Sequence, residues 1–298
     1  MLHNNSVHRS TLSLITAGVL WGTGGLAGSI LATHAALHPL AVAAYRLLIG
    51  GALSTAALAG QLRTLPRTVA TARRLLACGA LLAAFQACYF VAVTLSSVSL
   101  ATLLTIGSVP VFVAVVTAVR ERRLPSAGSA VAITLAGLGL ALLAGGPAAA
   151  GLAGVLVALV AGAGFAAFTL VNGNPVAGLE ARATSGLGLL IGGALLLPLA
   201  LPLGMHLPLT GQTVAAVAFL GAVPTALAYA AYFAGMRGAR PITAALSTVL
   251  EPLTATVLSV LLLGERLGVA GTLGAVLLGV ALMINYAGAV VKPAENQR

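Results

Sequence analysis

Long apolar runs separated by short polar connectors dominate the chain. Ten of these runs have the roughly 20 apolar residues that a helix needs to cross the hydrocarbon core of a bilayer. They lie at residues 11–33, 39–60, 75–96, 98–119, 126–145, 151–171, 184–203, 210–235, 241–263 and 268–291. The longest connectors, 61–74 and 172–183, are too short to form a soluble domain. The pattern predicts an all-α integral membrane protein with ten transmembrane helices.

A short sequence pattern occurs twice. Tyr89-Phe90, Pro110 and Glu121-Arg122 recur in the same order as Tyr232-Phe233, Pro252 and Glu265-Arg266, and each set is followed by an apolar run. The two copies are separated by 143, 142 and 144 residues at these three points. A nearly constant separation indicates a duplicated unit. We therefore expect two five-helix repeats, residues 1–147 and 148–298, around a central cavity.

The basic residues suggest how the two repeats are oriented. With the N-terminus in the cytoplasm, 13 of the 15 basic residues lie in the N-terminal segment, cytoplasmic connectors and C-terminal segment, as the positive-inside rule expects. The exceptions are Arg46, inside the second span, and Arg266, in the last outer connector. Five spans per repeat is an odd number, so the second repeat would be inverted relative to the first. We expect a multi-pass protein of the bacterial inner membrane with both termini in the cytoplasm.

Composition excludes several classes of function. Apolar residues make up 59% of the chain and charged residues 7%. There is no Asp, and the single Lys is Lys292, so a P-loop, an aspartyl-phosphate pump and an intramembrane Schiff base are all excluded. The formal charge of +10 is spread over connectors, which favours contacts with anionic lipid over nucleic acid. We expect no cofactor, no bound metal and no use of ATP.

Aromatic residues are scarce and unevenly distributed. Ten of the 13 lie on the first, third, sixth and eighth spans, and the repeat pairs the first span with the sixth and the third with the eighth. A belt at the membrane interface would spread them over all helices, so we interpret them as the lining of a shared cavity; simple packing between helices is the alternative. The candidate substrate-binding residues are Trp21, Gln86, Tyr89, Phe165, Phe168, Tyr229, Tyr232, Ser247 and Glu251.

Four residues are candidates for gating. Pro110 and Pro252 occupy matching positions of the fourth and ninth spans, and Pro224 lies in the eighth. Each removes a helical hydrogen bond and frees a carbonyl, either at a simple packing kink or at a hinge; the paired positions favour a hinge. Arg46 either extends toward the outer surface or attracts a substrate carboxylate and gates the outer side.

Glu251 is the one carboxylate inside a predicted span. A charge near the bilayer centre costs roughly 3 kcal/mol on insertion scales, so the side chain should face the interior of the bundle. Three roles remain open: a structural hydrogen bond to a neighbouring helix, contact with substrate or a gate, and proton coupling. Ser247 lies one turn earlier on the same face, and Val109 stands at the equivalent position of the first repeat.

These residues also carry a resemblance to a known family. Leu250-Glu251-Pro252, the segment 263–267 and the Gly-rich last span resemble the EamA family of the drug/metabolite transporter superfamily, as do Trp21-Gly22 and the spacing of Pro39 and Arg46. The resemblance implies export of small metabolites without ATP, and within the family the chain is similar to aromatic amino acid exporters. One departure is Gly164-Phe165, where the second repeat lacks a Trp-Gly pair.

We therefore expect a secondary transporter that exports small organic metabolites, mainly aromatic or other neutral amino acids, by alternating access. A passive facilitator or channel and a multidrug exporter of lipophilic compounds remain alternatives. An intramembrane enzyme is disfavoured, because several polar catalytic groups would have to meet at one depth and the spans hold a single Glu and no Asp. The expected partners are a small-molecule substrate and the lipid bilayer, with the protein a monomer or a weak homodimer.

Overall fold

The computed structural model describes residues 2–24, 28, 31, 35–58, 60, 62–96, 98–144, 151–174, 176–264, 266 and 268–291. Throughout these residues the regular structure is helical. The α-helices are α1 (Leu2–Gly22), α3 (Pro39–Ala56), α4 (Val69–Leu95), α5 (Val98–Glu121), α6 (Ala127–Leu143), α7 (Leu152–Asn172), α8 (Ala181–Ala200), α9 (Gly211–Gly221), α10 (Ala228–Met236), α11 (Pro241–Ser247), α12 (Leu250–Leu263) and α13 (Val269–Val291). Short 3₁₀ turns η1 (Leu62–Thr64) and η2 (Leu201–Leu203) follow α3 and α8, and a π-helix, η3 (Ala222–Leu227), joins α9 to α10.

Eight helical stretches are long and apolar enough to cross a membrane, counted by length and composition over the described residues. They are Pro39–Ala56, Val69–Leu95, Leu100–Glu121, Leu152–Asn172, Ala181–Leu203, Gly211–Met236, Pro241–Leu262 and Val269–Gly288. The apolar helix α6 is shorter, and α1 overlaps only the first half of the predicted span 11–33. The expected boundary between the repeats at residue 147, and the predicted motif residues Glu265 and Lys292, lie outside the described residues.

Polar residues at the helix starts explain several of the boundaries. His38 accepts a hydrogen bond from the Leu40 amide ahead of α3, and Pro39 fits the first helical position, where no intrahelical N–H bond is needed. Thr68 and Ser126 cap α4 and α6 through their hydroxyls in the same way. These caps satisfy backbone amides that would otherwise be exposed at the helix ends.

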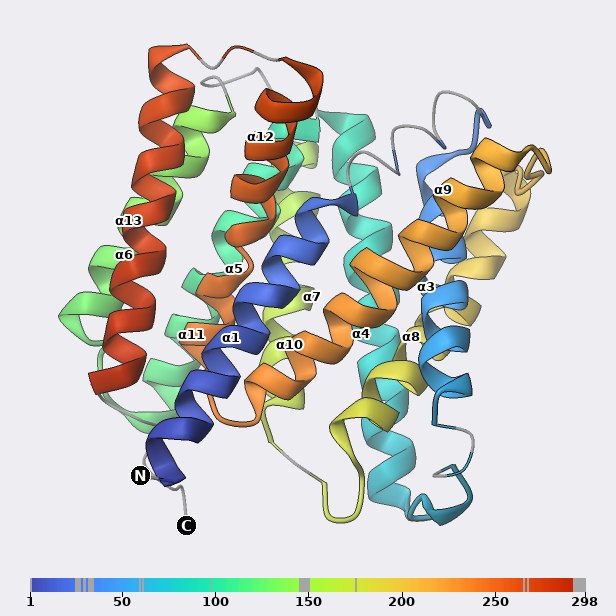
Figure 1. The fold of residues 1–298 in the computed structure, drawn as a ribbon, viewed down its shortest axis with the longest axis horizontal. Helices are drawn as coiled ribbons and strands as arrows, with labels where there is room; N and C mark the ends of the chain where they lie inside the picture. The colour runs from blue at the N-terminus through green and yellow to red at the C-terminus, as the bar shows by residue number, and fades with distance from the viewer. Residues whose placement is uncertain are drawn as a thin grey trace.

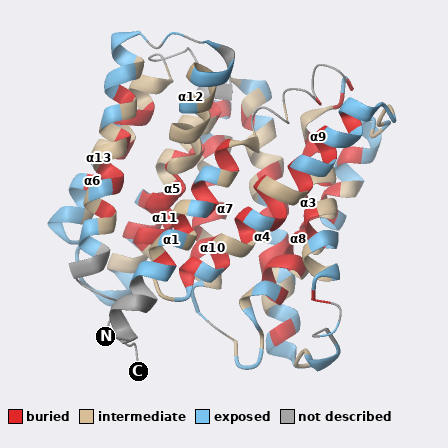
Figure 2. Cartoon of the chain, viewed as in Figure 1, coloured by how far each residue is buried: buried red, intermediate tan, exposed pale blue. Residues whose placement is uncertain are grey.

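The connectors fall into two groups at opposite ends of the molecule (Figure 1). Both chain ends lie at one end, together with the connectors α3–α4, α5–α6, α7–α8 and α10–α11. The connectors α4–α5, α8–α9 and α12–α13 lie at the other end. Buried residues follow the faces where helices meet, and exposed residues cover the outside and the ends (Figure 2). Large apolar side chains on the outside, such as Leu261, are typical of a surface that faces lipid.

Glycines bring corresponding helices of the two halves into close contact. A Cβ on Gly79 would overlap Ile191, and a Cβ on Gly221 would overlap Ile49. The two glycines are 142 residues apart, and so are the two isoleucines. The contacts between α4 and α8 are thus repeated between α9 and α3. Small residues at such crossings allow the backbones to approach, as is common between membrane helices.

Two predicted spans depart from regular helix. The span predicted at 241–263 is interrupted, because α11 ends at Ser247 and α12 begins at Leu250. The expectation that Pro252 sits within a continuous helix is corrected: it lies in the first turn of α12, where its missing N–H costs little. The eighth predicted span contains η3 around Pro224, whereas α5 continues through Pro110.

Candidate functional site

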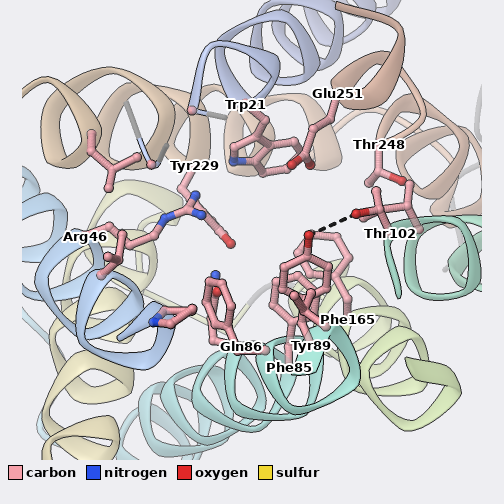
Figure 3. Close-up of a pocket in the computed structure, with 18 residues that line it drawn as sticks. Trp21, Arg46, Phe85, Gln86, Tyr89, Thr102, Phe165, Tyr229, Thr248 and Glu251 are labelled. Carbon is pink, nitrogen blue, oxygen red and sulfur yellow. Dashed lines mark hydrogen bonds between the residues drawn. The ribbon is translucent and has the colours of Figure 1, made fainter. Parts of the chain in front are cut away.

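A cavity of about 430 Å³ opens between helices from both halves of the chain (Figure 3). Its walls come from α1, α3, α4, α5, α7, α9, α10 and α12, together with the chain after α1. The lining includes Trp21, Arg46, Phe85, Gln86, Tyr89, Thr102, Phe165, Tyr229, Thr248 and Glu251. On α4 the lining residues lie in the C-terminal half and on α5 in the N-terminal half, so the cavity lies toward the end opposite the chain termini.

Aromatic side chains form one continuous wall. The Trp21 indole meets Tyr229 edge-on with ring centroids 5.3 Å apart, and it meets Phe165 at 6.0 Å. Phe165 in turn packs on Phe85 at 5.0 Å. Aromatic pairs such as the two edge-to-face contacts of Trp21 each contribute about 0.5–1.5 kcal/mol beyond their buried area. The wall is therefore aromatic and mostly apolar on the side where α1, α4, α7 and α10 meet.

Arg46 connects α3 to the π-helix η3. Its Nε donates to Thr225 Oγ1 at 3.3 Å, and its Nη2 donates to the Pro224 carbonyl at 3.4 Å. Thr225 Oγ1 also donates to the Leu220 carbonyl at 2.7 Å, which is the carbonyl that Pro224 leaves without its helical N–H. The freed carbonyl thus faces protein, and the arginine is held on the segment that carries the proline.

Glu251 faces the same cavity from the start of α12 (Figure 3). Within the described part of the chain, no side chain or backbone group forms a hydrogen bond or salt bridge with its carboxylate. Arg46 is close enough to interact with it electrostatically without forming an ion pair. The cavity therefore presents one cation and one carboxylate that are not paired with each other.

Trp21 carries a buried hydrogen-bond donor in the cavity wall. Its side chain is 5% exposed, and its Nε1 has no hydrogen-bond partner among the described residues. Figure 3 shows the indole nitrogen directed toward the side of the cavity where Arg46 lies. A buried N–H without a partner costs roughly 1–3 kcal/mol, which an acceptor on a bound ligand would recover.

Neutral polar groups complete the lining. Gln86 is buried in the α4 wall, and the Tyr89 hydroxyl shares a hydrogen bond of 2.9 Å with Thr102 Oγ1. Thr102 and Thr248 line the cavity but were absent from the residues predicted from sequence. Nothing in the sequence distinguishes these two from the many other threonines of the chain.

Six predicted residues lie outside the lining. Phe168 and Tyr232 are fully buried, and the Tyr232 hydroxyl bonds Thr169 Oγ1 at 2.9 Å. Ser247 donates to the Thr243 carbonyl and accepts from the Tyr286 hydroxyl, so it joins α11 to α13. The remaining three are the prolines Pro110, Pro224 and Pro252. Tyr89 and Tyr232 therefore do not face each other across the cavity, although they occupy matching positions of the two copies.

The fold and this cavity define a class: a helical membrane protein with an internal site, lined by charged and aromatic residues, between its two halves. Sequence comparison gives the family. The sequence profile of the family described as "EamA-like transporter family" matches residues 9–145 and again residues 152–287. The chain belongs to the EamA-like transporter family, and the double match shows that it contains two copies of the family's repeat.

Two further similarities agree with this assignment. Over 276 residues the chain is 30% identical to "Uncharacterized transporter YwfM" of Bacillus subtilis (strain 168), with 92% of each chain covered. A crystal structure described as "Crystal structure of protein" has the same fold, with a TM-score of 0.79 and 20% identity over 92% of this chain and 95% of that one. The protein is a membrane transporter.

Proposed function

We propose that the protein is a secondary transporter that exports neutral amino acids, aromatic ones foremost, across the bacterial inner membrane by alternating access. The observation that carries this proposal is the cavity that presents Arg46 and Glu251, which are not paired with each other, beside an aromatic wall. A zwitterion carries one charge for each of these side chains. The volume of about 430 Å³ lies within the range of about 300–1,000 Å³ typical of small-molecule sites.

The chemistry of the lining suggests how an amino acid would bind. Its carboxylate would accept hydrogen bonds from the Arg46 guanidinium, which lines the cavity. Its ammonium group would be attracted by Glu251, and an apolar side chain would pack on Phe85 and Phe165. This arrangement makes contact with substrate the role we propose for Glu251.

The proposed architecture is a pair of inverted five-helix repeats. It is supported by the double family match and by contacts that recur at a separation of 142 residues. It is also supported by the packing, because α1 packs on α10 and α12 as α7 packs on α4 and α5. The basic connectors share one end of the molecule with both termini, which supports a cytoplasmic location for that end.

Flux into proteoliposomes tests the proposed function. We expect uptake of labelled phenylalanine to be inhibited by other neutral amino acids and not by lipophilic cations. Inhibition by lipophilic cations alone would favour a multidrug exporter. Flux that never exceeds equilibration under an imposed proton gradient would indicate a passive facilitator.

The Glu251→Gln variant separates substrate contact from proton coupling. The amide keeps the size of the side chain and removes its charge, so we expect a higher KM for phenylalanine with an unchanged pH profile. Loss of the pH dependence together with loss of accumulation would instead assign proton coupling to this carboxyl group. The measurement is initial flux between pH 5 and 8 for the variant and the parent protein.

A further inference from the structure

The glycine contacts define which residues of the two halves correspond. Gly18 packs on the Ser247 carbonyl and Leu250, and Gly162 packs in the same way on the Thr105 carbonyl and Ser108. The glycines differ by 144 residues and their partners by 142. Between α3 and α8, Gly51 packs on Leu190 and Gly193 packs on Leu48, so the glycines and the leucines each differ by 142. The glycines of α4 and α9 differ by 142 as well. The helices α1, α3, α4 and α5 of the first half therefore each have a defined offset to their counterparts in the second.

The π-helix accounts for the one change of offset along a helix. Gly79 and Gly221, before η3, differ by 142, whereas Tyr89 and Tyr232, after it, differ by 143. A π-helix accommodates one extra residue within a continuous helix. The second half thus has one residue more than the first in this helix, and beyond it the offset is 143.

Applied to the cavity, these offsets give a second set of residues. Gly24 and Gly28 correspond to Phe168 and Asn172, and Val42 corresponds to Thr184. In the same way Tyr89 and Val93 correspond to Tyr232 and Met236, and Leu220 corresponds to Cys78. We call this set the inner cluster: Cys78, Phe168, Asn172, Thr184, Tyr232 and Met236.

Four members of the inner cluster, Cys78, Phe168, Asn172 and Thr184, lie in contact, and the Tyr232 hydroxyl reaches Thr169 Oγ1, next to Phe168 in the chain. The Asn172 side chain lies beside the Cys78 thiol and donates to the Phe168 carbonyl at 2.8 Å, and Cys78 Sγ lies 3.9 Å from the Thr184 carbonyl. Cys78 and Phe168 are 0% exposed. Asn172 and Met236 end α7 and α10, and Thr184 lies in the first turn of α8. These helix ends lead into the connectors that share an end with the chain termini (Figure 1).

Polar atoms in this closed region lack partners. Asn172 Oδ1 and Ser185 Oγ, next to Thr184, are buried without a hydrogen bond to any described residue. Thr55 Oγ1, at the end of α3 where it meets Gly186, is in the same state. Buried polar groups are usually paired, so the unpaired Asn172 Oδ1 beside Cys78 calls for a ligand or water in another conformation.

We propose that the inner cluster is a second substrate chamber, which opens toward the end of the chain termini when the cavity with Arg46 and Glu251 closes. This inference rests on the proposed alternating access. The positions that correspond to Arg46 and Glu251 are Gly188 and Val109. The six residues of the second chamber supply aromatic, hydroxyl, amide, thiol and thioether groups and carry no charge themselves, although Arg74, one turn before Cys78 on α4, is close enough to interact electrostatically with its thiol. The chamber takes the apolar part of a neutral amino acid while water solvates the charged groups.

Accessibility of the native thiol tests the chamber. The chain has two cysteines, so Cys88→Ala leaves Cys78 as the only target for a membrane-impermeant maleimide. Thr184→Cys in a background without native cysteines provides a second target. Ala132→Cys on α6, equally buried but outside the inner cluster, is the matched control, and Leu124→Cys, 90% exposed in the α5–α6 connector, gives the maximal rate.

We expect Cys78 and Thr184→Cys to react only from the side of the termini. If the open state is populated at about 0.1–10%, labelling is about 10- to 1,000-fold slower than at Leu124→Cys. Phenylalanine added on that side should slow labelling at both positions and leave Leu124→Cys unaffected. Ala132→Cys should stay unreactive.

Phenylalanine flux in the same vesicles separates the two proposals. If Cys78 and Thr184→Cys react no faster than Ala132→Cys while flux continues, the chamber is overturned and the transport proposal stands. If both positions label from the side of the termini without phenylalanine flux, the chamber stands and the amino-acid assignment is overturned. Labelling of Cys78 from the opposite side would also overturn the chamber.

Discussion

Arg46 has two of its five N–H donors engaged by Pro224 and Thr225 in η3. In the proposed binding mode, a substrate carboxylate at Arg46 would lie beside the segment where α9 becomes α10. Substrate recognition and the conformation of the π-helix would thus be linked through one side chain.

Replacing Arg46 tests its contact with the carboxylate. We expect Arg46→Gln to raise the KM for phenylalanine about ten- to a hundredfold, because a hydrogen bond to a charged group contributes about 1.5–3 kcal/mol. Arg46→Lys keeps the charge without the guanidinium fork and should have a smaller effect. Competition by phenethylamine, which lacks the carboxylate, should be nearly unchanged. Equal losses for both compounds would show that Arg46 acts only through structure.

The sequence predicted which types of residue line the cavity better than it predicted which individual residues border the cavity and which are enclosed by protein. Trp21, Tyr89, Phe165 and Tyr229 line the cavity, whereas Phe168, although one turn from Phe165, is enclosed by protein. In a membrane helix the face toward lipid and the face toward protein are both apolar, so periodicity does not reveal which aromatic residue borders a space.

Thr225 stabilises the irregular turn in the eighth predicted span. Its hydroxyl bonds the Leu220 carbonyl and accepts from Arg46. Thr225→Val keeps the shape and removes both interactions, so we expect unfolding in detergent to become easier by about 1–3 kcal/mol. Thr225→Ser retains the hydroxyl and should remain close to the parent protein. Equal destabilisation by both variants would show that the methyl group, rather than the hydroxyl, matters.

A second prediction about stability follows from the close helix crossings at Gly79 and Gly221. Gly79→Ala and Gly221→Ala place a methyl group against Ile191 and Ile49, so both should lower the unfolding temperature by similar amounts. Gly137 in α6 has no neighbouring atom within 4 Å, so Gly137→Ala should be neutral or stabilising by up to about 1 kcal/mol. Thermal unfolding in detergent checks all three. A neutral Gly79→Ala would contradict the tight crossing.

Hydropathy located most of the membrane-crossing stretches but not their irregularities. The break between α11 and α12 lies beside Ser247, Thr248 and Glu251 in a run that is apolar overall, and the π-helix η3 lies in an apolar run with Thr225 as its polar residue. Pro252 marked the neighbourhood of the break, but proline is also compatible with a continuous kinked helix, as Pro110 in α5 demonstrates. Packing against neighbouring helices decides whether a break or a continuous kinked helix forms. A single stretch of sequence does not encode that packing.

The orientation in the membrane is open to a direct test. We expect Leu124→Cys, in a connector at the end of the termini, to be labelled from the cytoplasmic side only. Gly204→Cys, in the α8–α9 connector at the other end, should be labelled from outside only. Labelling of both from one side would contradict the inverted arrangement. The prediction follows from the clustering of arginines in the connectors at one end.

The length of α6 has a consequence for the surrounding lipid. Its 17 residues extend about 26 Å, less than the roughly 30 Å of a typical hydrocarbon core. Because α6 packs on α13 at one edge of the bundle, the bilayer has to thin on that side or leave the ends of α6 mismatched. The thickness of the host membrane, set by acyl-chain length, therefore acts on this protein unevenly around its circumference.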